Sequence, residues 1–100
     1  MKLYLVTEDD RQVWVAALAH EVMYTYVANT GMFHNNNALR NDFYMVRNFT
    51  YDEIGTAEAR RLIAQGVGTL DDPDTIAMWR ADQSPLPPAD VLAMAAGSNE

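Results

Sequence analysis

Whether residues 13–28 form one helix or two strands decides the fold class that this chain can adopt. Large apolar residues recur there at every fourth position, as on one face of a helix: Trp14, Leu18 and Val22. Both ends of the segment are instead rich in β-branched and aromatic residues, which favour strands. Read alone, the segment fits either structure.

The residues that follow favour the strands. A strong turn signal, Asn-Thr-Gly at residues 29–31, is followed directly by two apolar residues, as expected when a β-hairpin continues into its next strand. We therefore predict strands over residues 13–17 and 23–27, after a first strand over residues 2–7. The predicted fold is α+β, with a small antiparallel sheet from the N-terminal half packed against two to four helices. A single helix over residues 13–28 would instead give an all-α bundle.

Helix start signals follow in the middle of the chain. Asn36 or Asn37 is a suitable N-cap for a short helix over residues 38–46. Further on, Thr50 and Glu53 have the spacing of a capping box, which predicts another helix start.

Two helices are predicted in the C-terminal half. The clearer one covers residues 56–65, with Thr56 as its N-cap and Gly66 as the residue that ends it. The other covers residues 73–81, with Asp72 as its N-cap and proline in its first position. This second helix should bury its two largest apolar residues on the core side, Ile76 and Trp79.

The length of the chain sets the domain organisation. Its 100 residues, 49% of them hydrophobic, are enough for one independently folding domain. Residues 83–88 contain most of the prolines and predict an extended linker. We therefore expect a single compact α+β domain over residues 1–82, and a Pro-rich linker with a short C-terminal helix or tail over residues 83–100.

The charge of the chain excludes two classes of partner. There are 7 Lys and Arg residues against 14 Asp and Glu, a formal net charge of −7. Proteins that bind nucleic acid or anionic membranes through charge need a basic surface, so we expect no direct nucleic-acid binding and no membrane binding. No apolar run approaches the roughly 18 residues of a membrane span, and the first residues lack a secretory pattern. We expect a cytoplasmic location.

Strong catalytic motifs are missing from the sequence. The chain has no cysteine, which excludes disulfides, thiolate nucleophiles and cysteine zinc sites. Its two histidines, His20 and His34, lack the spacing of a helical metal-binding pair. Gly66 and Gly68 are not followed by the residues of a nucleotide-binding loop, and the acidic residues at 71–74 are explained by helix capping. We assign no catalytic residue, metal or cofactor, and we favour a protein that is not an enzyme.

Residues 32–50 are the most unusual stretch, because five of the seven asparagines lie there among aromatic residues. Amide and aromatic side chains together can recognise a partner or a small polar ligand. The candidate binding residues are Phe33, His34, Asn36, Asn37, Asp42, Tyr44 and Arg47. A structural interpretation competes with this one, in which the asparagines form turns and caps and the phenylalanines fill the core.

The preferred hypothesis is a small acidic, non-enzymatic protein-interaction module, an adaptor or an inhibitor. Its partner would be another protein, and a homo-oligomer is also compatible. One alternative is a small-ligand-binding protein or minor hydrolytic enzyme that uses His34, Asp42 and Arg47. Another is an acidic nucleic-acid mimic that acts on a DNA-binding protein. The excess of arginine over lysine and the abundance of alanine suggest a high-GC bacterial origin, and small proteins of this composition are frequent in phages.

Overall fold

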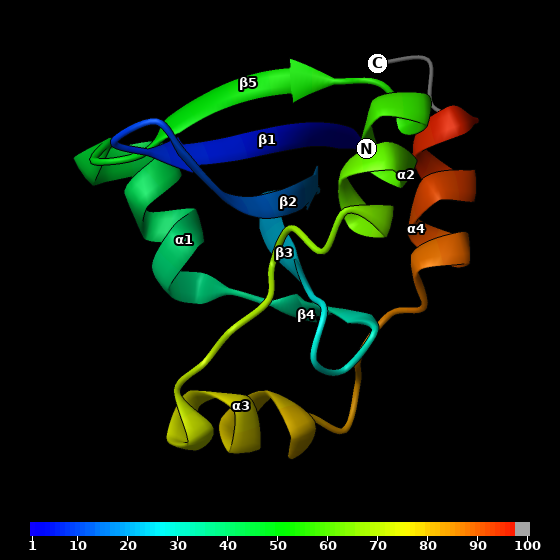
Figure 1. The fold of residues 1–100 in the computed structure, drawn as a ribbon. Helices are drawn as coiled ribbons and strands as arrows, with labels where there is room; N and C mark the ends of the chain where they lie inside the picture. The colour runs from blue at the N-terminus through cyan, green and yellow to red at the C-terminus, as the bar shows by residue number, and fades with distance from the viewer. Residues whose placement is uncertain (98–100) are drawn as a thin grey trace.

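A five-stranded antiparallel sheet forms the centre of the molecule, with its strands in the order β4-β3-β2-β1-β5 (Figure 1). The strands are β1 (Lys2–Glu8), β2 (Arg11–Ala19), β3 (Val22–Val27), β4 (Met32–Asn35) and β5 (Thr50–Ile54). The computed structural model describes residues 1–97, so the last three residues of the predicted tail lie outside the described residues. The predicted α+β class is confirmed.

The first three strands follow one another as hairpins because the sequence allows tight turns between them. Asp9 and Asp10 both have positive φ angles, 50° and 66°, and His20 and Glu21 have the same pair of values. Two-residue turns with positive φ angles match the twist of antiparallel strands. The prediction of strands within residues 13–28 is therefore confirmed, and the all-α alternative is excluded.

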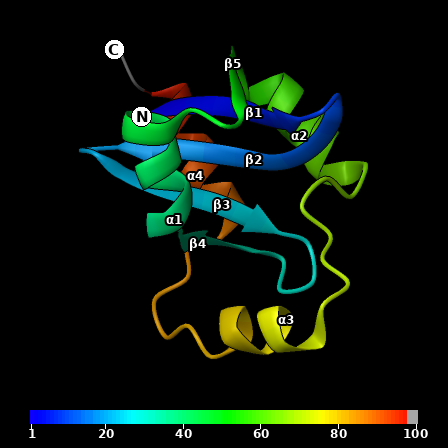
Figure 2. The same cartoon turned by 90° about the vertical axis from the view of Figure 1, so that its left-hand side faces the viewer.

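Helices cover both faces of the sheet. They are α1 (Asn37–Asn41), the π-helix η1 (Asp42–Val46), α2 (Thr56–Ala64), α3 (Pro73–Arg80) and α4 (Pro88–Ala96). Figure 1 and Figure 2 show α2 and α4 on one face and α1 on the opposite face, with α3 standing below the β4 edge. Alternate strand residues therefore enter two apolar clusters: Leu3 packs with α2 and α4, and Tyr4 packs with α1 and η1.

The helix predicted over residues 38–46 begins as expected but continues differently. Asn36 is its N-cap, because the side-chain Oδ1 accepts a hydrogen bond of 3.0 Å from the Leu39 N–H. After α1 the chain widens into η1, in which the Arg47 N–H reaches the carbonyl of Asp42, five residues back. The π-helical turn is not encoded in any pattern that the sequence analysis used.

The capping box predicted at Thr50 and Glu53 is wrong. Both residues lie in β5, which pairs with β1 so that Thr50 is opposite Thr7. Hydrogen bonding along a whole strand outweighs a local capping preference. The N-cap of α2 is Gly55, one residue before the predicted Thr56.

The two C-terminal helices differ in how they pack. α3 begins at Asp72 and Pro73 as predicted, but Ile76 and Trp79 are only half-buried, because α3 lies off the sheet edge. The short C-terminal helix expected in residues 83–100 is α4, which buries apolar residues in the cluster that contains Leu3. Within residues 1–97, no helix has the length and apolar character needed to cross a membrane.

Candidate functional site

His34 is enclosed by residues from three parts of the chain and is only 1% exposed. Its Nδ1 lies 2.8 Å from Oδ2 of Asp82, and its Nε2 lies 2.7 Å from Oγ1 of Thr30. The Trp79 ring packs against the imidazole, with ring centroids 5.3 Å apart. Because the Asp82 carboxylate accepts from Nδ1–H, Nε2 of the neutral ring is an acceptor. The single proton of the Thr30 hydroxyl lies within hydrogen-bonding reach of both this nitrogen and the Val27 carbonyl, which is 3.1 Å from Oγ1.

The Asp82 carboxylate is itself fixed by hydrogen bonds. The N–H of Ser84 donates to Oδ1 at 3.0 Å, and the His34 ring binds Oδ2. The Ser84 amide first, and His34 second, hold the pKa of Asp82 below its ordinary range. The carboxylate of Asp82 therefore remains ionised at neutral pH and continues to accept the hydrogen bond from the imidazole.

The hydroxyl of Thr30, the imidazole of His34 and the carboxylate of Asp82 follow one another in a chain of contacts. A catalytic nucleophile, its general base and the group that orients the base are arranged in the same order. Acyl transfer also needs free N–H groups that stabilise an oxyanion. The N–H groups of residues 30 and 31 both donate to a backbone carbonyl, and that of Met32 donates to the Thr30 hydroxyl itself. The arrangement thus fastens the β3–β4 hairpin to the segment after α3.

Asp42 is another buried polar residue of the stretch and is 7% exposed. Its Oδ2 accepts hydrogen bonds from the Tyr51 hydroxyl at 2.7 Å and the Phe49 N–H at 3.2 Å, and its Oδ1 accepts one from the Asn48 N–H at 2.9 Å. Burial raises the pKa of Asp42, but these three hydrogen bonds outweigh it and leave the pKa below its ordinary value. Burial, and then the hydrogen bond to Asp42, raise the pKa of Tyr51.

Arg47 ends η1 in a left-handed backbone conformation, with φ 60°. Its N–H donates to the Asp42 carbonyl at 2.7 Å. Its guanidinium lies over the rings of Phe43 and Tyr51, at 4.6 Å and 5.5 Å from the two centroids. A left-handed conformation costs a non-glycine residue about 1–2 kcal/mol, which these contacts offset.

Three consecutive side chains of η1 face the solvent. Tyr44 is 45% exposed, Met45 77% and Val46 52%. Arg40 lies over the Tyr44 ring at 5.3 Å from its centroid, and Arg47 follows Val46 in the chain. We call these five residues the η1 surface.

The remaining candidates have structural positions. Phe33 is fully buried and packs against Tyr26, with centroids 5.5 Å apart. Asn36 is 9% exposed and, besides capping α1, donates from Nδ2 to Oγ1 of Thr25 at 3.3 Å. Asn37 is the first residue of α1 and is exposed.

The candidate residues therefore do not meet in one site. Within residues 1–97, no hydrogen bond, ion pair or ring contact joins His34 to Asp42. Asp42 and Arg47 do lie together, because the Arg47 N–H donates to the Asp42 carbonyl at 2.7 Å, and the nearby charge of Arg47 helps to lower the pKa of Asp42.

The sequence patterns missed the partners of His34 and three residues of the η1 surface, Arg40, Met45 and Val46. Asp82 is 48 positions from His34, and no local pattern connects the two. A sequence signal does indicate that Met45 and Val46 are exposed: three consecutive large residues, starting at Tyr44, cannot all face the core from one helix.

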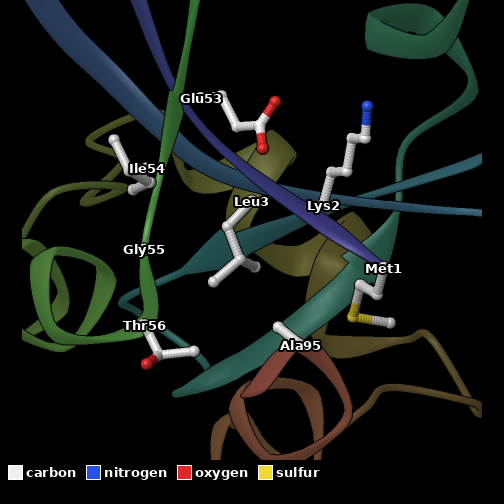
Figure 3. Close-up of a pocket in the computed structure, with 8 residues that line it drawn as sticks. All are labelled: Met1, Lys2, Leu3, Glu53, Ile54, Gly55, Thr56 and Ala95. Carbon is white, nitrogen blue, oxygen red and sulfur yellow. The ribbon is translucent and has the colours of Figure 1, made fainter. Parts of the chain in front are cut away.

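Two cavities of the described chain lie away from these groups. One, of about 130 Å³, is lined by Met1, Lys2, Leu3, Glu53, Ile54, Gly55, Thr56 and Ala95. Figure 3 shows Leu3 and Ala95 pointing toward each other, while the charged ends of Lys2 and Glu53 extend the opposite way. Another, of about 330 Å³, lies between the start of β2 and the loop of residues 66–71. Neither cavity includes a candidate binding residue.

In comparisons with known proteins, no family model, no curated protein and no solved structure matches this chain. In the part of the chain that the structure describes, no group of three or more His, Asp and Glu side chains is placed to hold a metal ion.

Proposed function

We propose that this protein is a small acidic, non-enzymatic protein-interaction module, an adaptor or an inhibitor, that binds its partner through the η1 surface. The observation that carries the proposal is the joint exposure of Tyr44, Met45 and Val46 on one turn. Apolar side chains exposed together on a folded domain mark contact sites. Tyrosine, methionine and arginine are the residue types enriched at such sites.

Buried hydrogen bonds fix the turn that carries the η1 surface. Asp42 fixes the backbone of Asn48 and Phe49 and the hydroxyl of Tyr51, so the exposed side chains project from a rigid base. A surface that is already ordered loses less conformational entropy on binding. Strained backbone such as the left-handed Arg47 persists where its surroundings enforce it, and such positions cluster at binding sites.

The charges of the η1 surface indicate the chemistry of the partner. Arg40 and Arg47 form no ion pair with a carboxylate within residues 1–97, and the Arg40 Nε–H donates to the backbone carbonyl of Glu21. Two unpaired guanidinium groups beside apolar side chains favour a partner that presents carboxylates around an apolar contact. The flexible Met45 side chain adapts to such a contact.

The proposal places the protein in the cytoplasm. A chain without cysteine needs no oxidising compartment for its fold, which is compatible with this location. An origin in a phage or mobile element of a high-GC bacterium belongs to the same hypothesis and is supported by composition alone.

A photo-crosslinking amino acid at position 45 tests the proposal, with the same amino acid at position 94 as the matched control. Met94 is also exposed, at 47%, but lies on α4. In extract of the source cells, position 45 should crosslink one protein that position 94 does not. The same products from both positions would contradict the proposal. A crosslink only to a second copy of the chain would make the η1 surface a dimer interface and overturn the adaptor role.

A further inference from the structure

α3 differs from the two neighbouring helices in how little of it is buried. None of its residues is buried, whereas α2 and α4 each bury two apolar residues. Figure 1 and Figure 2 show it standing off the sheet below β4. A helix of this length is not stable in water by itself, so α3 depends on whatever holds its segment. We call residues 71–85 the α3 strap.

Paired hydrogen bonds anchor the chain on both sides of the strap. Before it, the Asn29 side chain binds both backbone groups of Leu70, with Nδ2 donating to the carbonyl at 3.0 Å and the Leu70 N–H donating to Oδ1 at 2.7 Å. After it, Phe33 and Leu86 exchange two backbone hydrogen bonds of 2.8 Å each. These anchors tie the two ends to the β3–β4 hairpin.

Between the two anchors, the side chains of the strap form hydrogen bonds and ring contacts with a single residue of the β3–β4 hairpin. Within residues 1–97, His34 is the only residue outside the strap that shares a side-chain hydrogen bond or a ring contact with it: its Nδ1–H donates to Asp82, and its ring packs against Trp79. The Trp79 Nε1–H is buried without an acceptor. A buried donor without a partner destabilises the closed arrangement, because water satisfies the same donor once the strap opens.

We infer that the α3 strap opens and closes over the β4 edge as a unit, with His34 as its latch and the Asn29–Leu70 and Phe33–Leu86 pairs as its hinges. In the closed form Trp79 covers the imidazole and Asp82 binds it. In the open form the imidazole and the indole are both hydrated. The inference is independent of the proposed function, because no residue of the strap belongs to the η1 surface.

Hydrogen exchange of the unmodified protein gives the first test. The amides of Ile76 and Ala81, which bond to the carbonyls of Asp72 and Ala77, should exchange at least about 10-fold faster than the amides that pair β2 with β3, because they open without global unfolding. Equal protection of the helix and the sheet would overturn the inference.

Asp82→Ala gives the second test, with Asp71→Ala as the matched control. Both remove one carboxylate from the strap, but Asp71 is exposed and makes no side-chain hydrogen bond or ion pair in the described chain. Loss of the hydrogen bond to His34 should accelerate hydrogen exchange in α3 by a further factor of about 10. Exchange of the sheet amides should be unchanged, and Asp71→Ala should have no effect on either. Equal acceleration of sheet and helix, or none in either, would show that His34 and Asp82 are not a latch.

Discussion

The hydroxyl of Tyr51 lies 2.7 Å from Oδ2 of Asp42 and joins β5 to the π-helical turn that precedes it. The same carboxylate accepts the N–H groups of Asn48 and Phe49, so one side chain fixes both the end of η1 and the entry into the last strand. The exposed residues of the η1 surface depend on this buried network for their position. Their proposed binding role and the stability of the turn are therefore tested by separate substitutions.

Removal of the Tyr51 hydroxyl should destabilise the fold without removing the ring that packs against Phe43. We expect Tyr51→Phe to lower the free energy of unfolding by about 1.5–3 kcal/mol, the range for a hydrogen bond to a charged group. Urea denaturation measures the change. Tyr24→Phe is the control, because the half-buried Tyr24 hydroxyl has no hydrogen bond in the described chain, and equal losses in both variants would contradict the assigned role.

Asp42 should make the fold sensitive to acid. Its pKa is lowered in the folded state, so its contribution to stability is fully present above the unfolded value of about 4 and is lost as the pH falls through the folded value. Asn at position 42 cannot titrate, so Asp42→Asn should show a shallower loss of unfolding free energy from pH 4 down to pH 2. Urea titrations at several pH values check this. If Asp42→Asn and the exposed control Asp52→Asn keep the same acid dependence, the assignment is wrong.

Gly68 should tolerate no side chain. A Cβ there would lie 2.3 Å from the carbonyl oxygen of Tyr26, and the backbone has φ 97°. We expect Gly68→Ala to destabilise the fold by about 2 kcal/mol or more, because both the clash and the left-handed backbone act against it. Gly55→Ala meets nothing within 4 Å, and the loss of glycine at the N-cap of α2 should cost no more than about 1 kcal/mol. Thermal unfolding of the two variants gives the comparison, and similar melting temperatures would contradict it.

The sequence predicted the elements whose signals are local. The turn before Met32 identified the hairpin strands, and Asn36, Asp72 and Gly66 marked helix ends close to where the structure has them. The helix start predicted at Thr50 and Glu53 is wrong because the same polar residues suit both a helix cap and an exposed edge strand. Strand pairing with β1, which decides between them, depends on residues more than 40 positions away.

That residues 32–50 bind a partner stays a prediction. Residues 32–50 do contain the η1 surface, but His34 and Asp42 were grouped because they are close in sequence. In the fold, β4 places His34 beside Asp82, and η1 places Asp42 beside Tyr51. Both pairs depend on tertiary packing, which no local pattern specifies.

Exposed residues of the η1 surface should be dispensable for folding. Met45→Ser changes a side chain that is 77% exposed, and such changes usually stay within about 0.5 kcal/mol. Urea denaturation should therefore give the same midpoint as for the unmodified protein. A loss of several kcal/mol would mean that Met45 supports the fold and is not free to contact a partner.

The affinity of the double variant Tyr44→Ala/Met45→Ala for the purified crosslinked partner measures the contribution of the η1 surface to binding. Met78→Ala is the matched control, because Met78 is 57% exposed and lies on α3. Calorimetry should show that the Kd of the double variant is about 10-fold higher, as expected when central apolar contacts are truncated. The Kd of Met78→Ala should be unchanged. Equal affinities for all three proteins would show that the partner binds elsewhere.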